Sequence, residues 1–290
     1  RGLPEPSASI FSAMVLGSRQ GLPPALVSAF NVTGLTHLVA ISGAQITLLI
    51  GLMSAVLPYL GVHRRAGFYL ISALLCAYLA LIGLPASAVR AGVMGWLFLL
   101  AHHVGRRTQG WRLLLYAAVA MVAENPRILR DDVGFQLSFA AVAGLLGLEP
   151  LLERLLRFIP RRLGLRSALA MTLAATIFTL PLIAVQFGRL SLVSVVTNVL
   201  VFPVSSAAML TGLLGLAVAP WFRDLAWIIW LPTHLPLAYL AAVAAWFTRL
   251  PFAQLAVTLP TFLLFPSYLA LAFGVRWLNR WLEERRRYAL

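Results

Sequence analysis

Residues 190–219 read LSLVSVVTNVLVFPVSSAAMLTGLLGLAVA and contain no charged side chain. About 20 apolar residues suffice for a helix to cross the hydrocarbon core of a bilayer, so this stretch is long enough. The rest of the chain is similar, because 61% of its 290 residues are hydrophobic, 11% are charged and the mean hydropathy is +0.89. Soluble domains carry about 25% charged residues. The composition therefore excludes a soluble globular domain and predicts a multi-pass integral membrane protein.

The apolar stretches predict an all-α, polytopic helical bundle with about nine membrane crossings and with broken or re-entrant helices. Leu22, Leu26 and Phe30 recur every four residues among polar ones, which predicts an amphipathic helix over 21–36 at the membrane surface. We divide the chain into an N-terminal segment, 1–37, and a transmembrane domain, 38–290. The predicted crossings are 38–60, 66–84, 86–104, 113–123, 133–148, 167–187, 190–219, 225–249 and 259–282.

The basic residues predict the orientation of the chain. All 23 are arginines, and the net charge is +14. The exclusive use of arginine fits a GC-rich genome. The functional alternative is phosphate binding, because the planar guanidinium forms two hydrogen bonds to phosphate. With the loop 61–65 in the cytoplasm, 16 arginines fall on the cytoplasmic side and four (Arg127, Arg130, Arg189 and Arg249) fall outside. By the positive-inside rule, we expect a cytoplasmic (inner) membrane protein with its C-terminus in the cytoplasm and the amphipathic helix outside.

Neither a cofactor nor a metal is expected. The single cysteine, Cys76, can form neither an intramolecular disulfide nor a thiolate cluster, and no nucleotide-binding loop is present. The chain starts with Arg1 rather than Met, from which we expect a piece of a longer protein.

Polar residues interrupt the apolar pattern at four places, where they are costly unless they face a cavity or a partner helix. The first place contains His37, Ser42, Gly43 and Gln45. Ser42 and Gly43 predict a local unwinding of the helix, which is tolerated at depth only where backbone is buried in protein or lines water. The alternative is an ordinary helix start at the interface, with His37 hydrated.

The second place runs from Pro85 to Gly92 and contains Arg90. Pro85 predicts a helix break, and Ser87, Ala91 and Gly95 form a stripe of small residues for close helix packing. Arg90 lies about one turn inside the outer boundary. It either snorkels to the interface or faces an anion in an outer vestibule.

The third place groups Asp132 and Gln136 on one helix face, with Phe135 and Phe139 forming an adjacent stripe. The alternative to a binding face is a charged helix start, since an acid there favours the helix dipole, followed by core aromatics.

The fourth place follows Phe187-Gly188 and contains Asn198 and Pro203. We expect Asn198 to be hydrogen-bonded within the membrane, and Pro203 to break its helix, as in transport proteins. The alternative is polar contact between helices.

No hydrolytic motif such as Gly-x-Ser-x-Gly or His-Glu-x-x-His occurs in the sequence. His37 and Ser42 could suggest an intramembrane hydrolase, but no third group is evident that would orient the base. We therefore expect no enzyme activity.

These stretches, in this order, resemble the competence membrane domain of ComEC-type DNA-uptake channels. The matching elements are Leu16-Gly17-Ser18-Arg19-Gln20-Gly21-Leu22, His37 to Gly43, Arg90 in a Pro-Ser-x-x-Arg-Ala-like motif, Asp132 to Phe139, and Phe187-Gly188 with Asn198 and Pro203. Together they cover most of the chain. Gln45 stands where many relatives have His, and Ser18 where Asp is common. The family's OB-like and metallo-β-lactamase-like domains are missing, so their activities are not assigned to this chain.

The resemblance implies that the chain carries one strand of incoming DNA across the membrane. It implies further domains and other DNA-uptake proteins as partners, besides membrane lipids. Single strands are held by basic grooves with stacking aromatics, for which Arg90, Phe135 and Phe139 are candidates. The alternative is a small-solute secondary transporter, but such proteins often carry inverted repeats and no clear repeat is found in this sequence. Without a nucleotide site, a motor would have to be another protein.

Overall fold

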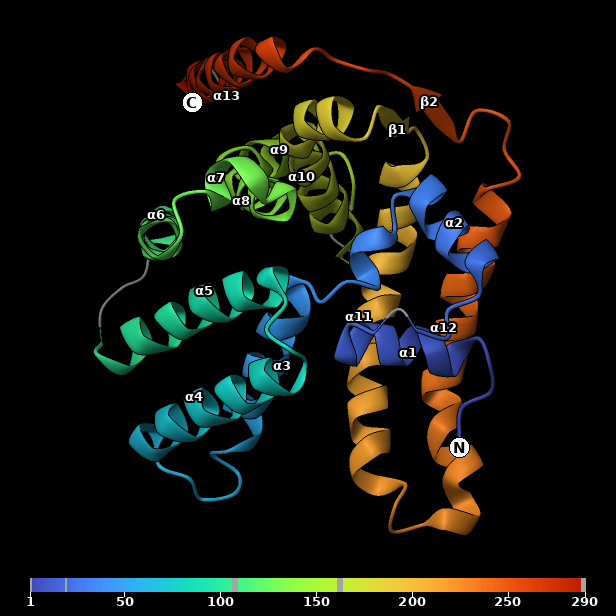
Figure 1. Cartoon of the computed structure of the whole chain (residues 1–290). Coiled ribbons are helices and arrows are strands. Elements are labelled where there is room, and N and C mark those ends of the chain that lie inside the picture. The colour runs from blue at the N-terminus through green and yellow to red at the C-terminus, as the bar shows by residue number, and fades with distance from the viewer. Residues whose placement is uncertain (1, 19, 106–108, 161–163, 288–290) are drawn as a thin grey trace.

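The computed structural model describes residues 2–18, 20–105, 109–160 and 164–287 (Figure 1). Arg19 of the first family-like element lies outside these residues, as do Arg106, Arg107, Arg161 and Arg162 of the predicted charge asymmetry. The described elements are α1 Ser7–Leu16, α2 Pro24–Thr33, η1 Thr36–Leu38, α3 Gly43–Val56, α4 Arg64–Leu81, α5 Ala86–His103, α6 Gly110–Glu124, α7 Ile128–Asp131, α8 Val133–Gly147, α9 Glu149–Leu155, α10 Leu165–Gln186, β1 Arg189–Ser191, α11 Ser194–Val218, η3 Arg223–Leu225, α12 Ala226–Phe247, β2 Gln254–Ala256, η4 Thr261–Leu263 and α13 Leu264–Arg287.

The pair α11–α12 forms one side of the molecule and packs with α1 and α2 (Figure 1). Its core contains Phe11, Phe30, Val201 and Leu237. Gly212 lets α1 approach α11 closely, because a Cβ there would lie 2.1 Å from the Phe11 ring. At one end of the pair, β1 and β2 form a short antiparallel ladder in which Leu190 lies opposite Leu255. The N-terminal helices α1 and α2 are thus joined to α11 and α12, far along the chain.

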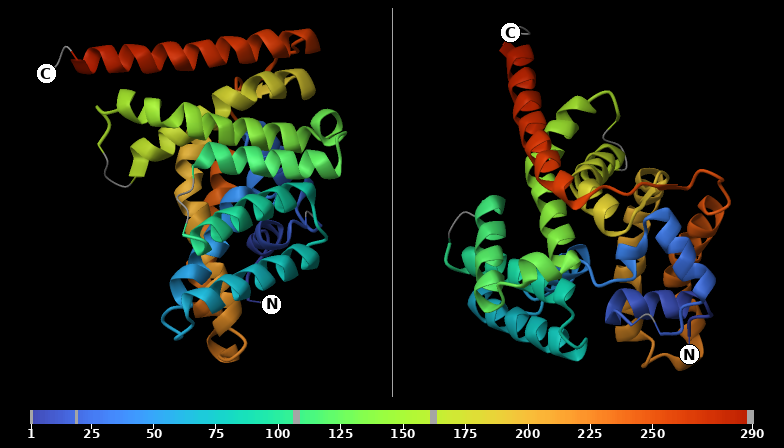
Figure 2. Two further views of the ribbon diagram at one scale, coloured as in Figure 1. Left: turned by 90° about the vertical axis from the view of Figure 1, so that its left-hand side faces the viewer. Right: turned by 45° about the horizontal axis from the view of Figure 1, so that its top comes forward.

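Two further groups of helices complete the bundle. Helices α3, α4 and α5 pack around Ile46, Ile71 and Leu75. Helices α9, α10 and α13 share a core around Leu152 and Ala174, and α8 crosses α10 closely at Gly144, where a Cβ would lie 2.5 Å from the Ala174 carbonyl oxygen. Figure 2 shows α13 lying along one edge of this third group. The all-α, polytopic fold class is therefore confirmed.

The number of membrane-length helices is lower than predicted. Within the described residues, six helices are long and apolar enough to cross a membrane, or seven if the bent pair α8 and α9 is counted as one span. The predicted crossings at 86–104 and 113–123 account for the difference. Helix α5 contains Arg90, His102 and His103, and α6 has 15 residues, which is short of the roughly 20 that a bilayer needs.

The predicted interruptions have different outcomes. The first span is irregular before α3, because a short 3₁₀ turn ends at Leu38 and the α-helix begins only at Gly43. Pro85 immediately precedes α5 and sets its start, as predicted. The prediction that Pro203 breaks its helix is wrong. Helix α11 has 25 residues and continues through Pro203. A proline removes a single N–H donor, and membrane helices tolerate this where neighbouring groups satisfy the freed carbonyl.

The predicted amphipathic helix is α2, which is shorter than the stretch 21–36. Its apolar face, formed by Leu26, Ala29 and Phe30, is buried, whereas Ser28 and Asn31 are more exposed. The buried face packs mainly against α12.

Candidate functional site

The turn before α3 is held by the side chain of Gln45. Its Oε1 accepts a hydrogen bond from the Ser42 backbone N–H at 2.7 Å, and its Nε2 donates one to the Leu38 carbonyl at 3.1 Å. Gln45 is buried at 6% exposure. Since both ends of the amide are engaged with backbone groups that have no helical partner, Gln45 stabilises the irregular backbone between η1 and α3.

His37 lies on η1, at the surface of the protein. Its Nδ1 is 3.1 Å from the Gly34 carbonyl oxygen, so this nitrogen carries the proton if the contact is a hydrogen bond. Ser42 is not among its hydrogen-bond partners in the described part of the chain. The pairing that a hydrolase would need between these two side chains is therefore not formed.

Arg90 and Asp132 form an ion pair between α5 and the start of α8. Arg90 Nη1 is 3.1 Å from Asp132 Oδ2, and the side chains are 3% and 26% exposed, respectively. The second carboxylate oxygen, Oδ1, accepts a hydrogen bond from the Phe135 N–H at 2.9 Å and so caps α8. The guanidinium, for which the sequence left open snorkelling or an anion in an outer vestibule, is buried, and its anionic partner is a carboxylate of the same chain 42 positions away.

Gly134 allows this pair to form. A Cβ at Gly134 would lie 3.0 Å from Asp132 Oδ1 and 3.2 Å from Arg90 Nη2. Any larger residue at this position would therefore press against both charged groups. Arg90 Nε is buried and has no hydrogen-bond partner among the described residues, so one donor of the guanidinium is left unused there.

The other residues of this stretch also have structural contacts. Gln136 Nε2 donates to the carbonyls of Leu129 and Arg130, at 2.8 and 3.2 Å, and so closes the turn from α7 into α8. Phe135 is buried and stacks on the half-buried ring of Phe139, with centroids 4.2 Å apart. Of the two aromatic rings, Phe139 is therefore the more accessible.

The first four family-like elements lie close to one another at three points, two of them glycines and the third the ion pair. A Cβ at Gly17 would lie 2.9 Å from Ile41 Cδ1, which joins the first element to the second. A Cβ at Gly43 would lie 3.9 Å from the Cβ of Ala91, which joins the second element to the third. The Arg90–Asp132 pair joins the third to the fourth. The beginnings of α3 and α8 and the first turns of α5 therefore meet at one place, which we call the junction.

The fifth element does not complete this junction. Phe187 is exposed, and the half-buried Asn198 makes no side-chain hydrogen bond to the residues that the structure describes. The expected polar contact is made instead by its neighbour Thr197, which is fully buried and donates to the Thr33 carbonyl at 2.8 Å. Sequence reasoning missed Thr197 because a threonine in a membrane helix usually bonds its own helix backbone.

No group of three or more metal-ligating side chains occurs among the described residues. Among the described residues of the junction, the charged contact is the Arg90–Asp132 pair.

Comparisons with known proteins identify the family of this chain. A family model described as "Competence protein" matches residues 14–281. ComE operon protein 3 of Bacillus subtilis is 27% identical over 210 residues, which cover 72% of this chain and 26% of that protein. The uncharacterized protein YcaI of Escherichia coli is 27% identical over 277 residues, which cover 84% and 35%. The chain therefore spans about a quarter to a third of the length of these curated relatives. No solved structure matches the chain.

Proposed function

Because this chain belongs to the competence protein family, we propose that it takes part in DNA uptake and carries single-stranded DNA across the cytoplasmic membrane, with no chemistry of its own. The observation that carries the proposal is the junction, where four family-like elements from distant parts of the chain come into contact. The proposed partners are the DNA strand, membrane lipids, and further domains and proteins of a DNA-uptake machine.

The ion pair is compatible with a weak contact to the strand. A free arginine fork binds phosphate in two places, whereas transport requires contacts that are weak enough to be released and repeated. Asp132 compensates the charge of Arg90, and the carboxylate is itself 26% exposed. We infer that a passing phosphate competes with Asp132 for Arg90, so that the path opens only while the strand occupies it.

The other candidates along the proposed path contribute differently. The half-buried ring of Phe139 is available to stack on a base, which is worth about 1–3 kcal/mol per base in single-strand binders. His37 lies exposed on η1, whereas Gly43 and Gln45 shape the turn before α3.

The rival proposal, a small-solute transporter, has less support. It drew on a broken helix around Pro203 and on a hydrogen-bonded Asn198. Helix α11 is continuous, and Asn198 makes no side-chain hydrogen bond to the described residues.

Transformation frequency in the full-length protein tests the proposal. We expect Arg90→Ala to reduce transformation at least tenfold per unit of membrane-inserted protein. Arg249→Ala is the matched control, because Arg249 is exposed, lies on the same predicted side, and has no ion pair with the described residues. If both variants transform like the wild type at equal protein level, Arg90 has no part in the path.

Crosslinking separates transport of DNA from transport of solutes. A photoreactive single strand, added during uptake, should label residues near Ser42, Arg90 and Gln136. Labelling confined to the cytoplasmic loops would contradict a path through the junction.

A further inference from the structure

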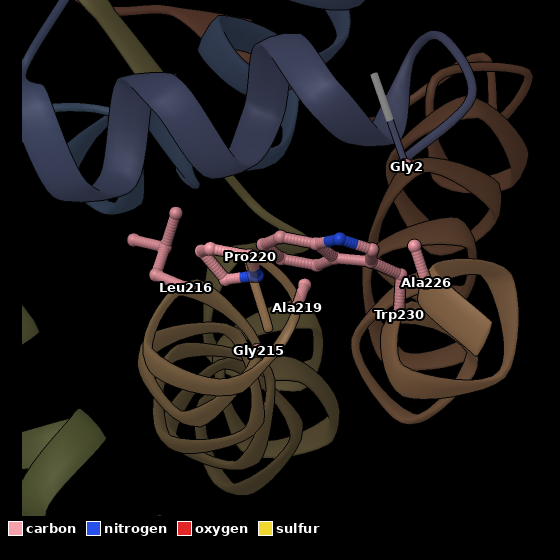
Figure 3. Close-up of a pocket in the computed structure, with 7 residues that line it drawn as sticks. All are labelled: Gly2, Gly215, Leu216, Ala219, Pro220, Ala226 and Trp230. Atoms are coloured by element: carbon pink, nitrogen blue, oxygen red, sulfur yellow. The ribbon is translucent and has the colours of Figure 1, made fainter. Parts of the chain in front are cut away.

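The end of the α11–α12 hairpin contains an apolar cavity that the proposed function does not use. Its volume is about 540 Å³, within the roughly 300–1,000 Å³ range of small-molecule sites. Apart from the indole nitrogen of Trp230, the lining carries no polar side-chain atom (Figure 3). The lining residues are Gly2, Gly215, Leu216, Ala219, Pro220, Ala226 and Trp230.

Trp230 forms one wall of the cavity and is held in place on two sides. Its ring meets Phe11 edge-on, with centroids 5.9 Å apart. The ring also lies over Gly215, where a Cβ would be 3.2 Å from it. Its indole N–H has no acceptor among the described residues. The cavity is therefore an apolar space beside a half-buried indole. Within the described part of the chain its N–H is an unused donor, and Gly2 lies close to it, since a Cβ there would be 2.4 Å from the indole nitrogen. The N–H of a buried tryptophan usually finds a hydrogen-bond partner.

The aromatic residues of α12 place this cavity at the depth of a membrane interface. Trp227 and Trp246 are both exposed, at 67% and 57%, near opposite ends of the helix. Their separation along the helix corresponds to about 28 Å at 1.5 Å per residue, close to the roughly 30 Å thickness of the hydrocarbon core. Exposed tryptophans mark the two membrane interfaces, and the cavity lies at the Trp227 end, beside the exposed Trp221 and Phe222.

We propose that this cavity holds the upper part of one phospholipid acyl chain, whose ester carbonyl accepts the hydrogen bond of the Trp230 N–H. The methylenes of the chain contact the apolar lining between α11 and α12. The site is independent of the DNA path, since none of its lining residues belongs to the junction.

The dimensions of the site favour a lipid chain over a protein helix. Apart from Gly2, its lining comes from positions 215–220 at the end of α11 and positions 226–230 at the start of α12. Each stretch is shorter than two helical turns, whereas a docked helix uses anchors over i to i+7 or more. The described lining residues carry no charge that would hold a charged solute. A lipid acyl chain at the acyl–headgroup boundary fits both features of the site. Its methylenes contact the apolar wall, and its ester carbonyl accepts from the single donor.

Photocrosslinking in lipid nanodiscs tests the proposal on the whole chain. The probe is a phosphatidylglycerol with a diazirine in the upper third of one acyl chain. We expect the segment 215–230 to be labelled and Ala226→Phe, which fills the cavity, to reduce that labelling at least fivefold. Ala270→Phe on the exposed surface of α13 is the matched control and should leave it unchanged. Both variants are compared after confirming equal thermal stability, and Leu216→Trp replaces Ala226→Phe if the latter does not fold.

A second comparison tests the hydrogen bond. Wild-type protein should retain the ester-linked probe several-fold better than an ether-linked probe that lacks the carbonyl, and Trp230→Phe should abolish this preference. Equal labelling in wild type and in the cavity-filling variant would overturn the proposal. Absence of label at 215–230 in the wild type, as expected if a protein segment fills the cavity, would overturn it as well.

Discussion

Replacing Asp132 separates two contributions that its carboxylate makes to the α5–α8 contact. Oδ1 caps α8 through the Phe135 N–H, and Oδ2 pairs with Arg90. Asp132→Asn keeps an acceptor for the cap and removes the charge, whereas Asp132→Ala removes both. The two variants should therefore destabilise the protein to different extents.

The magnitudes follow from burial. Removing one partner of a fully buried ion pair costs about 3–5 kcal/mol. Because the Asp132 side chain is 26% exposed and water can reach it, we expect a smaller loss of about 2–3 kcal/mol for Asp132→Asn. Loss of the cap adds about 1 kcal/mol, so Asp132→Ala should lose about 3–4 kcal/mol.

Equilibrium unfolding in mixed micelles measures these free energies, and a double-mutant cycle isolates the pair. Arg90→Met removes the buried cation and fills a similar volume, so the double variant with Asp132→Asn should recover at least 1 kcal/mol of the summed losses. If Asp132→Asn unfolds like the wild type, the ion pair does not hold α5 to α8. If Asp132→Asn and Asp132→Ala lower the free energy of unfolding by the same amount, the helix cap contributes nothing to stability.

Three further substitutions and one control variant test the packing around the junction and the helix pairs by the same unfolding assay. Gln45→Ala should cost about 1–3 kcal/mol, because it leaves two backbone groups without partners, and a loss below 0.5 kcal/mol would contradict that role. Thr197→Val should cost about 1 kcal/mol by removing the hydrogen bond to the Thr33 carbonyl, and no loss would show that this bond is dispensable. Gly144→Ala should cost about 1–3 kcal/mol through overpacking against α10, whereas Gly274→Ala, which meets nothing within 4 Å, should be neutral or slightly stabilising.

Features set by local sequence could be predicted from the chain alone. Pro85 begins a helix, and Ser42-Gly43 marks an irregular start, because backbone geometry at those positions depends on the residues themselves. The membrane class followed from composition. The family resemblance, which rested on the order of short motifs, is confirmed by the family match over residues 14–281.

Features that depend on how helices are rotated and paired could not be predicted. Asn198 and Thr197 are neighbours, and which of them meets the α2 carbonyl depends on the rotation of α11. Arg90 and Asp132 were each identified as unusual, but their spacing of 42 positions says nothing about contact. The helix break predicted at Pro203 does not occur, since a helix packed among neighbours tolerates the loss of one backbone donor.

The burial of the junction constrains the DNA path that we propose. Arg90 is 3% exposed and Phe135 is 4% exposed, so neither lines an open surface in this arrangement. A strand that passes between α5 and α8 must therefore separate them, and the Arg90–Asp132 pair is the polar contact it would have to replace. Because a phosphate can take the place of the carboxylate at the guanidinium, the cost of separation is offset only while the strand is present. The same pair that stabilises the resting bundle would then keep the path closed to ions in the absence of DNA.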